Sequence, residues 1–161
     1  MALFKAYDIR GIVPDDLNAE KAYSIGRAIA AFMESGPIAV GRDARTHSPE
    51  LTDALIDGIR DEGLDVLDLG LVATPMLYFG VEQLSANAGV MVTASHNPGE
   101  YNGFKICRAH AVPVGEDSGL KDIEALVPKR QEATKAAKRG GISEHNVLEG
   151  YAAHALSVGE H

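Results

Sequence analysis

The amino-acid sequence predicts an α/β fold, a mainly parallel mixed sheet with helices on both of its faces. Short apolar runs typical of buried strands alternate along the chain with amphipathic stretches of helical period, and glycines or prolines separate them. Such alternation implies right-handed crossovers between parallel strands. A chain of 161 residues has room for one hydrophobic core of ordinary size, so it needs neither a disulfide nor a metal to fold.

The predicted elements follow from local signals. Residues 18–35 carry apolar side chains at helical spacing, and Asn18 is a suitable N-cap for this helix. The second helix begins at Ser48, where proline occupies the first turn, and ends at Gly63. The other predicted elements of this part are strand 37–41, strand 65–70, helix 74–84, turn 87–89 and strand 90–93.

The C-terminal part departs from this alternation. A further helix is expected over 117–127, so residues 1–127 are predicted to form the α/β domain. Residues 128–142 are polar and lysine-rich, and they read equally well as an interdomain linker or as an exposed final helix. Residues 143–161 are predicted to begin an incomplete second domain, because the helical pattern over 143–157 has no core of its own. That helix needs a partner surface, which favours self-association of the chain.

Composition excludes several classes of function. Fifteen Lys and Arg against twenty-three Asp and Glu give a formal charge of −8, which argues against a nucleic-acid binder. No apolar run reaches the 18 residues of a membrane span, and the first residues lack the pattern of a secretory signal. The single cysteine, Cys107, cannot form an internal disulfide. We therefore expect a protein of the cytoplasm without membrane contact.

Residues 92–98, Val-Thr-Ala-Ser-His-Asn-Pro, are the most informative stretch of the chain. They set Ser95 and His96 on a turn directly behind the apolar run 88–93. Open α/β sheets place reactive groups at the carboxyl ends of their strands, so this position favours chemistry at Ser95. The alternative is a turn whose side chains only bond their own backbone.

Three other segments strengthen the functional interpretation. They are Lys-Ala-Tyr-Asp-Ile-Arg-Gly at 5–11, Gly-Arg-Asp-Ala-Arg at 41–45 and Tyr-Asn-Gly-Phe-Lys at 101–105. Together with the serine turn, and in this order, they resemble the α-D-phosphohexomutase family over roughly residues 4–127. The resemblance is greatest to the phosphomannomutase/phosphoglucomutase branch, and the phosphoglucosamine branch of the same family is an alternative.

This resemblance implies an activity and a cofactor. Ser95 would be carried as a phosphoserine that transfers phosphate between O1 and O6 of a hexose phosphate through a bisphosphorylated sugar. Mg²⁺ is the expected cofactor, with the phosphate on Ser95 as one of its ligands. The partners implied are hexose phosphate, hexose bisphosphate and later domains of the same enzyme.

Site residues are carried over position by position. Lys105 would be a general acid/base and Arg10 would stabilise charge, both facing the phosphoserine together with Tyr7. His96 and Asn97 would shape the serine turn, with His96 near the transferring phosphate or merely bonded to backbone. Arg42 and Arg45 are candidate phosphate-binding groups, and with Asp43 they could instead form a structural ion pair. Gly103 would supply a positive φ or a close approach of phosphate.

Two alternatives of different class remain. A serine hydrolase is disfavoured, because adjacent Ser and His side chains diverge and no Gly-x-Ser-x-Gly elbow occurs. A phosphosugar-binding module without turnover is the stronger alternative. The mutases' metal loop Asp-Gly-Asp-x-Asp-Arg, their sugar loop and their terminal phosphate loop are absent from this sequence. We therefore expect an N-terminal domain that is inactive by itself.

Overall fold

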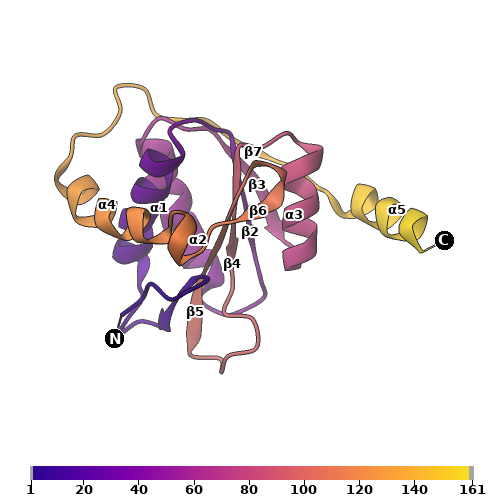
Figure 1. Ribbon diagram of the computed structural model, residues 1–161, viewed down its shortest axis with the longest axis horizontal. Coiled ribbons are helices and arrows are strands. Elements are labelled where there is room, and N and C mark those ends of the chain that lie inside the picture. The colour runs from indigo at the N-terminus through magenta and orange to yellow at the C-terminus, as the bar shows by residue number, and fades with distance from the viewer. Residues whose placement is uncertain (1, 160–161) are drawn as a thin grey trace.

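A mixed sheet of seven strands forms the centre of the computed structural model, which describes residues 2–159 (Figure 1). The strands are β1 (Ile9–Ile12), β2 (Ile38–Arg42), β3 (Val66–Leu71), β4 (Ala88–Val92), β5 (Tyr101–Arg108), β6 (Val112–Pro113) and β7 (Ile142–Glu144). The helices are α1 (Ala19–Met33), α2 (Ser48–Asp61), α3 (Thr74–Gln83), α4 (Leu120–Glu132) and α5 (Leu148–Val158), with 3₁₀ turns at Ala109–Ala111 and Glu116–Ser118.

The sheet has a parallel half and an antiparallel half. Its strand order is β1-β5-β4-β2-β3-β7, with β6 beside β5. Strands β4, β2, β3 and β7 run parallel, whereas β5 runs antiparallel to β4, and β1 antiparallel to β5. The predicted class, a mainly parallel mixed sheet in an α/β fold, is confirmed. The antiparallel strands β1 and β5 carry no assignment in the sequence-based prediction.

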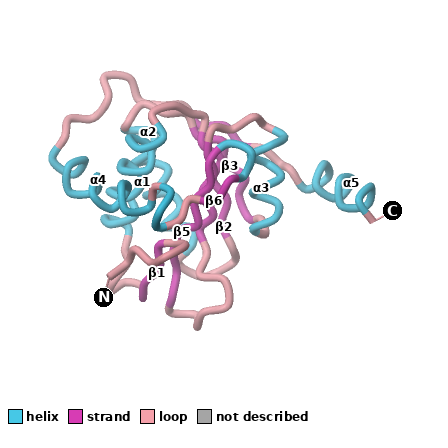
Figure 2. The backbone as a smooth tube through the Cα atoms, viewed as in Figure 1, coloured by secondary structure: helices cyan, strands magenta, loops and turns pink. Residues whose placement is uncertain are grey.

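Helices cover both faces of this sheet, as expected. Helices α1, α2 and α4 lie on one side and α3 on the other (Figure 2). Ile29, Leu55 and Val90 belong to the core on the first side, while Leu77 and Met91 belong to the core beneath α3. Because both faces of β2 and β4 are buried, these strands are apolar at nearly every position, as in other parallel sheets.

The predicted bounds of helices α1, α2 and α3 and of strands β2, β3 and β4 agree with the structure to within two residues. Asn18 caps α1 as predicted, its Oδ1 accepting a hydrogen bond from the Lys21 amide at 3.0 Å. Helix α4 differs, because it begins three residues later than predicted and continues through Pro128 to Glu132.

The segment after α4 lies against the domain. Arg27, whose side chain is almost fully buried, donates to the carbonyls of Ala133 and Thr134 and pairs with Glu62 at 2.8 Å. The chain then adds β7 beside β3, and α5 projects beyond the sheet at the C-terminal end (Figure 1). Where the second domain begins stays a prediction. Within residues 2–159, no helix combines the length and apolar character that crossing a lipid bilayer requires.

Candidate functional site

Ser95 stands on the loop that joins β4 to its antiparallel neighbour β5. Its φ is +54°, in the left-handed region that residues other than glycine rarely adopt. Its amide donates to the Thr93 hydroxyl at 3.0 Å, and the side chain of Ser95 is exposed. A serine held in a costly backbone conformation and open to solvent is a good candidate for a reactive group.

Gly103 brings Arg10 beside this loop. Strand β1 pairs with β5 in a register that sets Arg10 opposite Gly103. A Cβ atom at Gly103 would lie 1.9 Å from the carbonyl oxygen of Ile9, so only glycine permits this approach of the two strands. The expectation of a positive φ at Gly103 is wrong, because the positive-φ glycines of the described chain are Gly63, Gly70 and Gly119.

The Arg10 guanidinium reaches the serine turn. Its Nη1 donates to Asn97 Oδ1 at 3.0 Å, and its Nη2 pairs with the carboxylate of Asp8. The Arg10 Nε is buried and has no hydrogen-bond partner among the described residues. A buried N–H without an acceptor is costly, so this atom is suited to an incoming acceptor such as a phosphate oxygen.

Lys105 lies on the same face of the sheet as Arg10. It is opposite Met91 of β4 and two residues beyond Gly103, the partner of Arg10. Within residues 2–159 its ammonium makes no hydrogen bond or ion pair, and the residue is half-buried. The structure therefore places an unpaired ammonium group on the sheet face that Lys105 shares with Arg10.

Arg45 is the most strongly bound of the predicted residues. Its two Nη atoms donate to the carbonyls of Ser95, Asn97, Pro98 and Tyr101 at 2.7–3.1 Å. Its Nε lies 3.3 Å from the carboxylate of Asp43. Except for Asp43, these acceptors belong to the loop that carries Ser95 or, for Tyr101, to the first residue of β5.

Asp43 connects the Arg45 side chain to both neighbouring elements. Its carboxylate accepts from the hydroxyls of Ser48 at 2.6 Å and Thr93 at 2.7 Å, and from the Arg45 amide at 3.1 Å. Burial by itself would raise the pKa of the Asp43 carboxyl, but these hydrogen bonds and the Arg45 charge outweigh it and hold the pKa below the ordinary value.

His47 and Asn102 are site residues that the sequence did not reveal. The Asn102 amide, fully buried, donates to His47 Nδ1 at 2.9 Å and to the Ser48 hydroxyl at 2.8 Å. His47 Nε2 lies 3.1 Å from the carbonyl of Gly99, so the neutral ring with its proton on Nε2 satisfies both contacts. The only signals in the sequence were that Asn102 belongs to the motif at 101–105 and that His47 follows the motif at 41–45.

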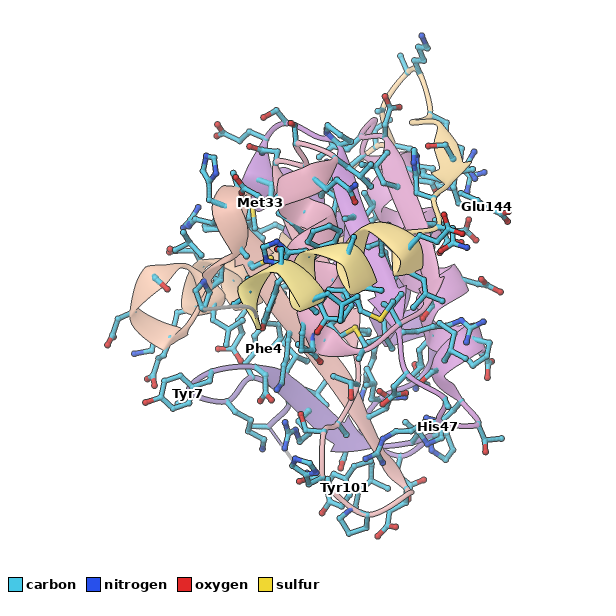
Figure 3. All side chains as sticks on the ribbon, turned by 90° about the vertical axis from the view of Figure 1, so that its right-hand side faces the viewer. Phe4, Tyr7, Met33, His47, Tyr101 and Glu144 are labelled. Atoms are coloured by element: carbon cyan, nitrogen blue, oxygen red, sulfur yellow. The ribbon has the colours of Figure 1, made fainter. Side chains whose placement is uncertain are left out.

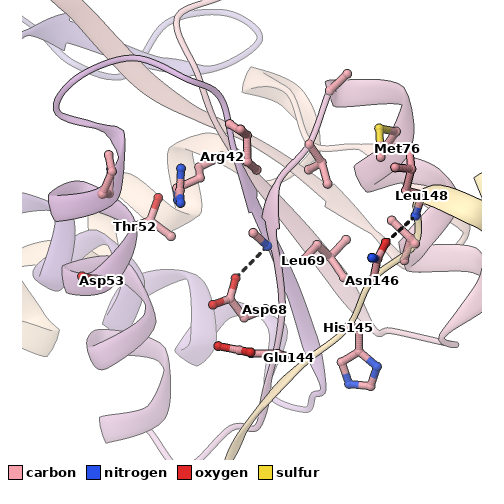
Figure 4. A pocket seen from close by; sticks show the side chains of 16 residues that line it. Arg42, Thr52, Asp53, Asp68, Leu69, Met76, Glu144, His145, Asn146 and Leu148 are labelled. Atoms are coloured by element: carbon pink, nitrogen blue, oxygen red, sulfur yellow. Dashed lines mark hydrogen bonds between the residues drawn. The ribbon is translucent and has the colours of Figure 1, made fainter.

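The remaining predicted residues lie apart from these contacts. Arg42 faces a hollow of about 1030 Å³ between α2, β3 and the chain leading into α5, where Figure 4 shows it near Thr52 and Asp68. Tyr7 is 85% exposed and lines a separate hollow beside Gly115. His96 is exposed on the turn itself. Figure 3 places Tyr7, Tyr101 and His47 at one end of the molecule.

The side chains that the structure describes do not form a complete Mg²⁺ site. Within residues 2–159, no group of three or more His, Cys, Asp or Glu side chains could hold a metal ion. Asp8, the acidic residue nearest in sequence to Arg10, is already paired with it. A phosphate on Ser95 would add one oxygen ligand, whereas Mg²⁺ prefers octahedral coordination.

Comparison with known proteins identifies the family. Residues 1–134 match the model described as phosphoglucomutase/phosphomannomutase, alpha/beta/alpha domain I. The chain is 44% identical over 157 residues to an Escherichia coli protein named phosphomannomutase, covering 97% of this chain and 34% of the relative. A Klebsiella pneumoniae phosphomannomutase is 45% identical over 152 residues, covering 94% of this chain and 97% of the relative.

A solved structure shows the same arrangement in space. A phosphoglucomutase/phosphomannomutase family protein from Burkholderia thailandensis superposes with a TM-score of 0.85 at 32% identity, covering 98% of this chain and 36% of that one. The chain thus spans about a third of the length of the Escherichia coli and Burkholderia relatives. Sequence and fold agree that the chain belongs to the phosphoglucomutase/phosphomannomutase family.

Proposed function

We propose that this chain is the phosphoserine-bearing first domain of a phosphohexomutase that interconverts hexose 1- and 6-phosphates. The observation that carries the proposal is the exposed Ser95, held at φ +54° on a turn that Arg10 contacts through Asn97, with Lys105 on the same sheet face as Arg10. The names of the relatives, phosphomannomutase and phosphoglucomutase, support the reaction class of an isomerase of carbohydrate metabolism.

The proposed transfer uses the groups of this face. A hydroxyl oxygen of a hexose monophosphate attacks the phosphorus of phosphoserine 95, and the bond from phosphorus to Ser95 Oγ breaks. The proton of the attacking hydroxyl ends on Ser95 Oγ, and Lys105 hands it over as general acid/base. Arg10 stabilises charge on the transferred group through its unpartnered Nε and through Nη1, which already positions Asn97. The reverse transfer at the other end of the bisphosphorylated sugar restores the phosphoserine.

His96 and Tyr7 are proposed to contact substrate from the rim of the site. Both side chains are exposed. His96 follows Ser95 on the turn, and Tyr7 precedes β1, the strand that carries Arg10. Arg42 is proposed as a phosphate contact from its own hollow beside α2. Mg²⁺, which neutralises charge on a transferring phosphoryl group when bound, would need carboxylates from outside this chain.

We also propose that the protein works in the cytoplasm, since its single cysteine is buried and unpaired. By itself the chain is expected to be inactive, because the metal carboxylates and the sugar-recognising groups are not among its residues. Its partners are then hexose phosphate, hexose bisphosphate and the segment that the longer relatives carry beyond this third.

The proposal is tested by joining this chain to the remaining two thirds of the Escherichia coli relative and assaying hexose 1-phosphate to 6-phosphate conversion. The joined protein should turn over, whereas its Ser95→Ala variant should lose nearly all activity and still bind hexose phosphate, because a covalent step is removed rather than a contact. Activity of the alanine variant within about tenfold of the parent would remove Ser95 from the mechanism. Robust turnover by the 161-residue chain alone would contradict its predicted inactivity.

The same assay decides between this proposal and its alternative. A phosphosugar-binding module would bind hexose phosphate equally well with and without the added segment and would show no turnover in either form. Such a module would also bind the phosphate of its ligand through the unpartnered Arg10 Nε.

A further inference from the structure

The four Nη N–H groups of Arg45 are all bonded within the protein, and its Nε is paired with a carboxylate. An arginine side chain offers five N–H donors. In this structure Nη1 donates to Pro98 and Tyr101 at 2.8 and 3.1 Å, Nη2 donates to Ser95 and Asn97 at 3.0 and 2.7 Å, and Nε faces Asp43. A phosphate could bind the Nη atoms of Arg45 only by displacing hydrogen bonds that the protein already makes, and at Nε it would compete with the carboxylate of Asp43.

Those bonds fix the path of the serine turn. The four acceptors are main-chain carbonyls spread from Ser95 to Tyr101, and they all point at one cation. Carbonyl dipoles that converge in this way repel one another unless a positive group lies between them. The Arg45 charge therefore favours this one conformation of the loop, including the left-handed backbone at Ser95.

Arg45 is itself held in place. Asp43 receives hydrogen bonds from Ser48, at the start of α2, and from Thr93, at the end of β4. Thr93 also accepts the amide of Ser95 at 3.0 Å. The carboxylate thus fixes the guanidinium relative to both elements that flank the turn, and the guanidinium side chain is only 15% exposed.

His47 supports the far side of the same turn. Its ring bridges the Gly99 carbonyl and the buried Asn102 amide. Asn102 lies in β5, next to the glycine that admits Arg10. The short loop before α2, residues 43–47, therefore contacts the turn at its beginning, its middle and its end.

We propose that the 43–47 loop is a template for the serine turn and that Arg45 is a positioning residue rather than a phosphate ligand. Its role in catalysis rests on the proposed function, whereas its role in ordering the turn does not. Arg45 acts by holding Ser95 where the transfer takes place and leaves the binding of the sugar phosphate to other groups.

Amide hydrogen exchange of this chain tests the ordering role. The amides of Asn97 and Tyr101 are hydrogen-bonded within the turn, to Ala94 and Pro98, so their exchange reports its opening. Arg45→Ala and Arg45→Lys should both accelerate this exchange by roughly tenfold or more, because the compact charge of lysine cannot reach four carbonyls. The matched control is Arg139→Ala, which removes a guanidinium bound to Asp57 and Asp61 instead and should leave the turn unchanged. Unchanged exchange in both Arg45 variants would overturn the template.

Kinetics of the joined protein test the catalytic role. Arg45→Lys should lower kcat by roughly tenfold or more while KM for hexose phosphate stays within about threefold, because positioning of the phosphoserine and not sugar binding is lost. A rise in KM of roughly tenfold with kcat unchanged would mark Arg45 as a phosphate ligand and overturn the proposal. If the unmodified joined protein shows no turnover while Arg45 variants still loosen the turn, the proposed function fails and the template stands.

Discussion

Substitution of Gly103 by alanine should separate β1 from β5 and withdraw Arg10 from the serine turn. The new Cβ would lie 1.9 Å from the Ile9 carbonyl oxygen, 2.9 Å from its carbon and 3.0 Å from Arg10 Cα. All three atoms are main chain, so no side-chain rotation relieves the contact. Restoring an ordinary separation of 3.4 Å requires a shift of 3.4 − 1.9, about 1.5 Å, along the direction of the strand pairing.

The cost follows from that shift. Overpacking costs about 1 to 3 kcal/mol, and weakening roughly two ladder hydrogen bonds at about 1 kcal/mol each brings the total to about 3 to 5 kcal/mol. For a chain of this size the melting temperature should fall by roughly 6 to 20 °C. Tm is measured by circular dichroism at neutral pH.

Gly99→Ala is the matched control for this prediction. It makes the same substitution in the loop that leads into β5, and no atom lies within 4 Å of the added Cβ. Its Tm should stay within about 2 °C of the parent, since removing a glycine from an open position changes stability little. A Gly103→Ala protein as stable as the Gly99→Ala control would refute the close approach of β1 to β5.

Three further predictions concern the site and the C-terminal helix. In the joined protein, Arg10→Ala and Lys105→Ala should each lower kcat by roughly 10²-fold or more with little change in Tm, and an effect on Tm alone would make them structural residues. The pKa of Asp43 lies below its ordinary 3.8, so its contribution to stability is present above that pH and is lost as the pH falls further. Asp43→Asn should therefore lower Tm at neutral pH and flatten its acid dependence, and parallel acid titrations of Tm for the two proteins would contradict this. Leu148 and Leu156 on α5 are 57% and 72% exposed, so the chain should self-associate at high concentration. Light scattering should show less association for Leu156→Glu, and a strictly monomeric parent would contradict the prediction.

The parallel half of the fold was predictable because its strands are apolar on both faces and its helices carry clear caps and stripes. Strand β5 was not, since its sequence mixes Asn102, Gly103 and Lys105 with apolar residues and resembles a loop. Asn102 is buried only because it bonds Ser48 and His47, a contact between segments more than 50 residues apart. No periodicity within one segment contains such information.

The candidate site likewise has residues that the sequence predicted and contacts that it did not. The motifs named Arg10 and Lys105, and the pairing of β1 with β5 and the alternation along β5 place these two residues on one face of the sheet. Their roles beside Ser95 stay predictions. The contacts of Arg45 could not be predicted, because its acceptors are main-chain carbonyls that any sequence possesses. Arg42, three residues earlier, looked equivalent in the motif, but it faces the hollow between α2, β3 and the chain leading into α5.

The most direct test of the account is whether Ser95 carries a phosphoryl group. The joined protein and its Ser95→Ala variant would be purified and incubated with a hexose 1,6-bisphosphate. Their intact masses would then be measured, and peptide mapping would locate the modification. The account predicts one added phosphoryl group on the peptide containing Ser95, removed by hexose monophosphate and absent from the variant. A parent protein that never carries this phosphate while it converts hexose 1-phosphate, or a phosphate that maps to another residue, would contradict it.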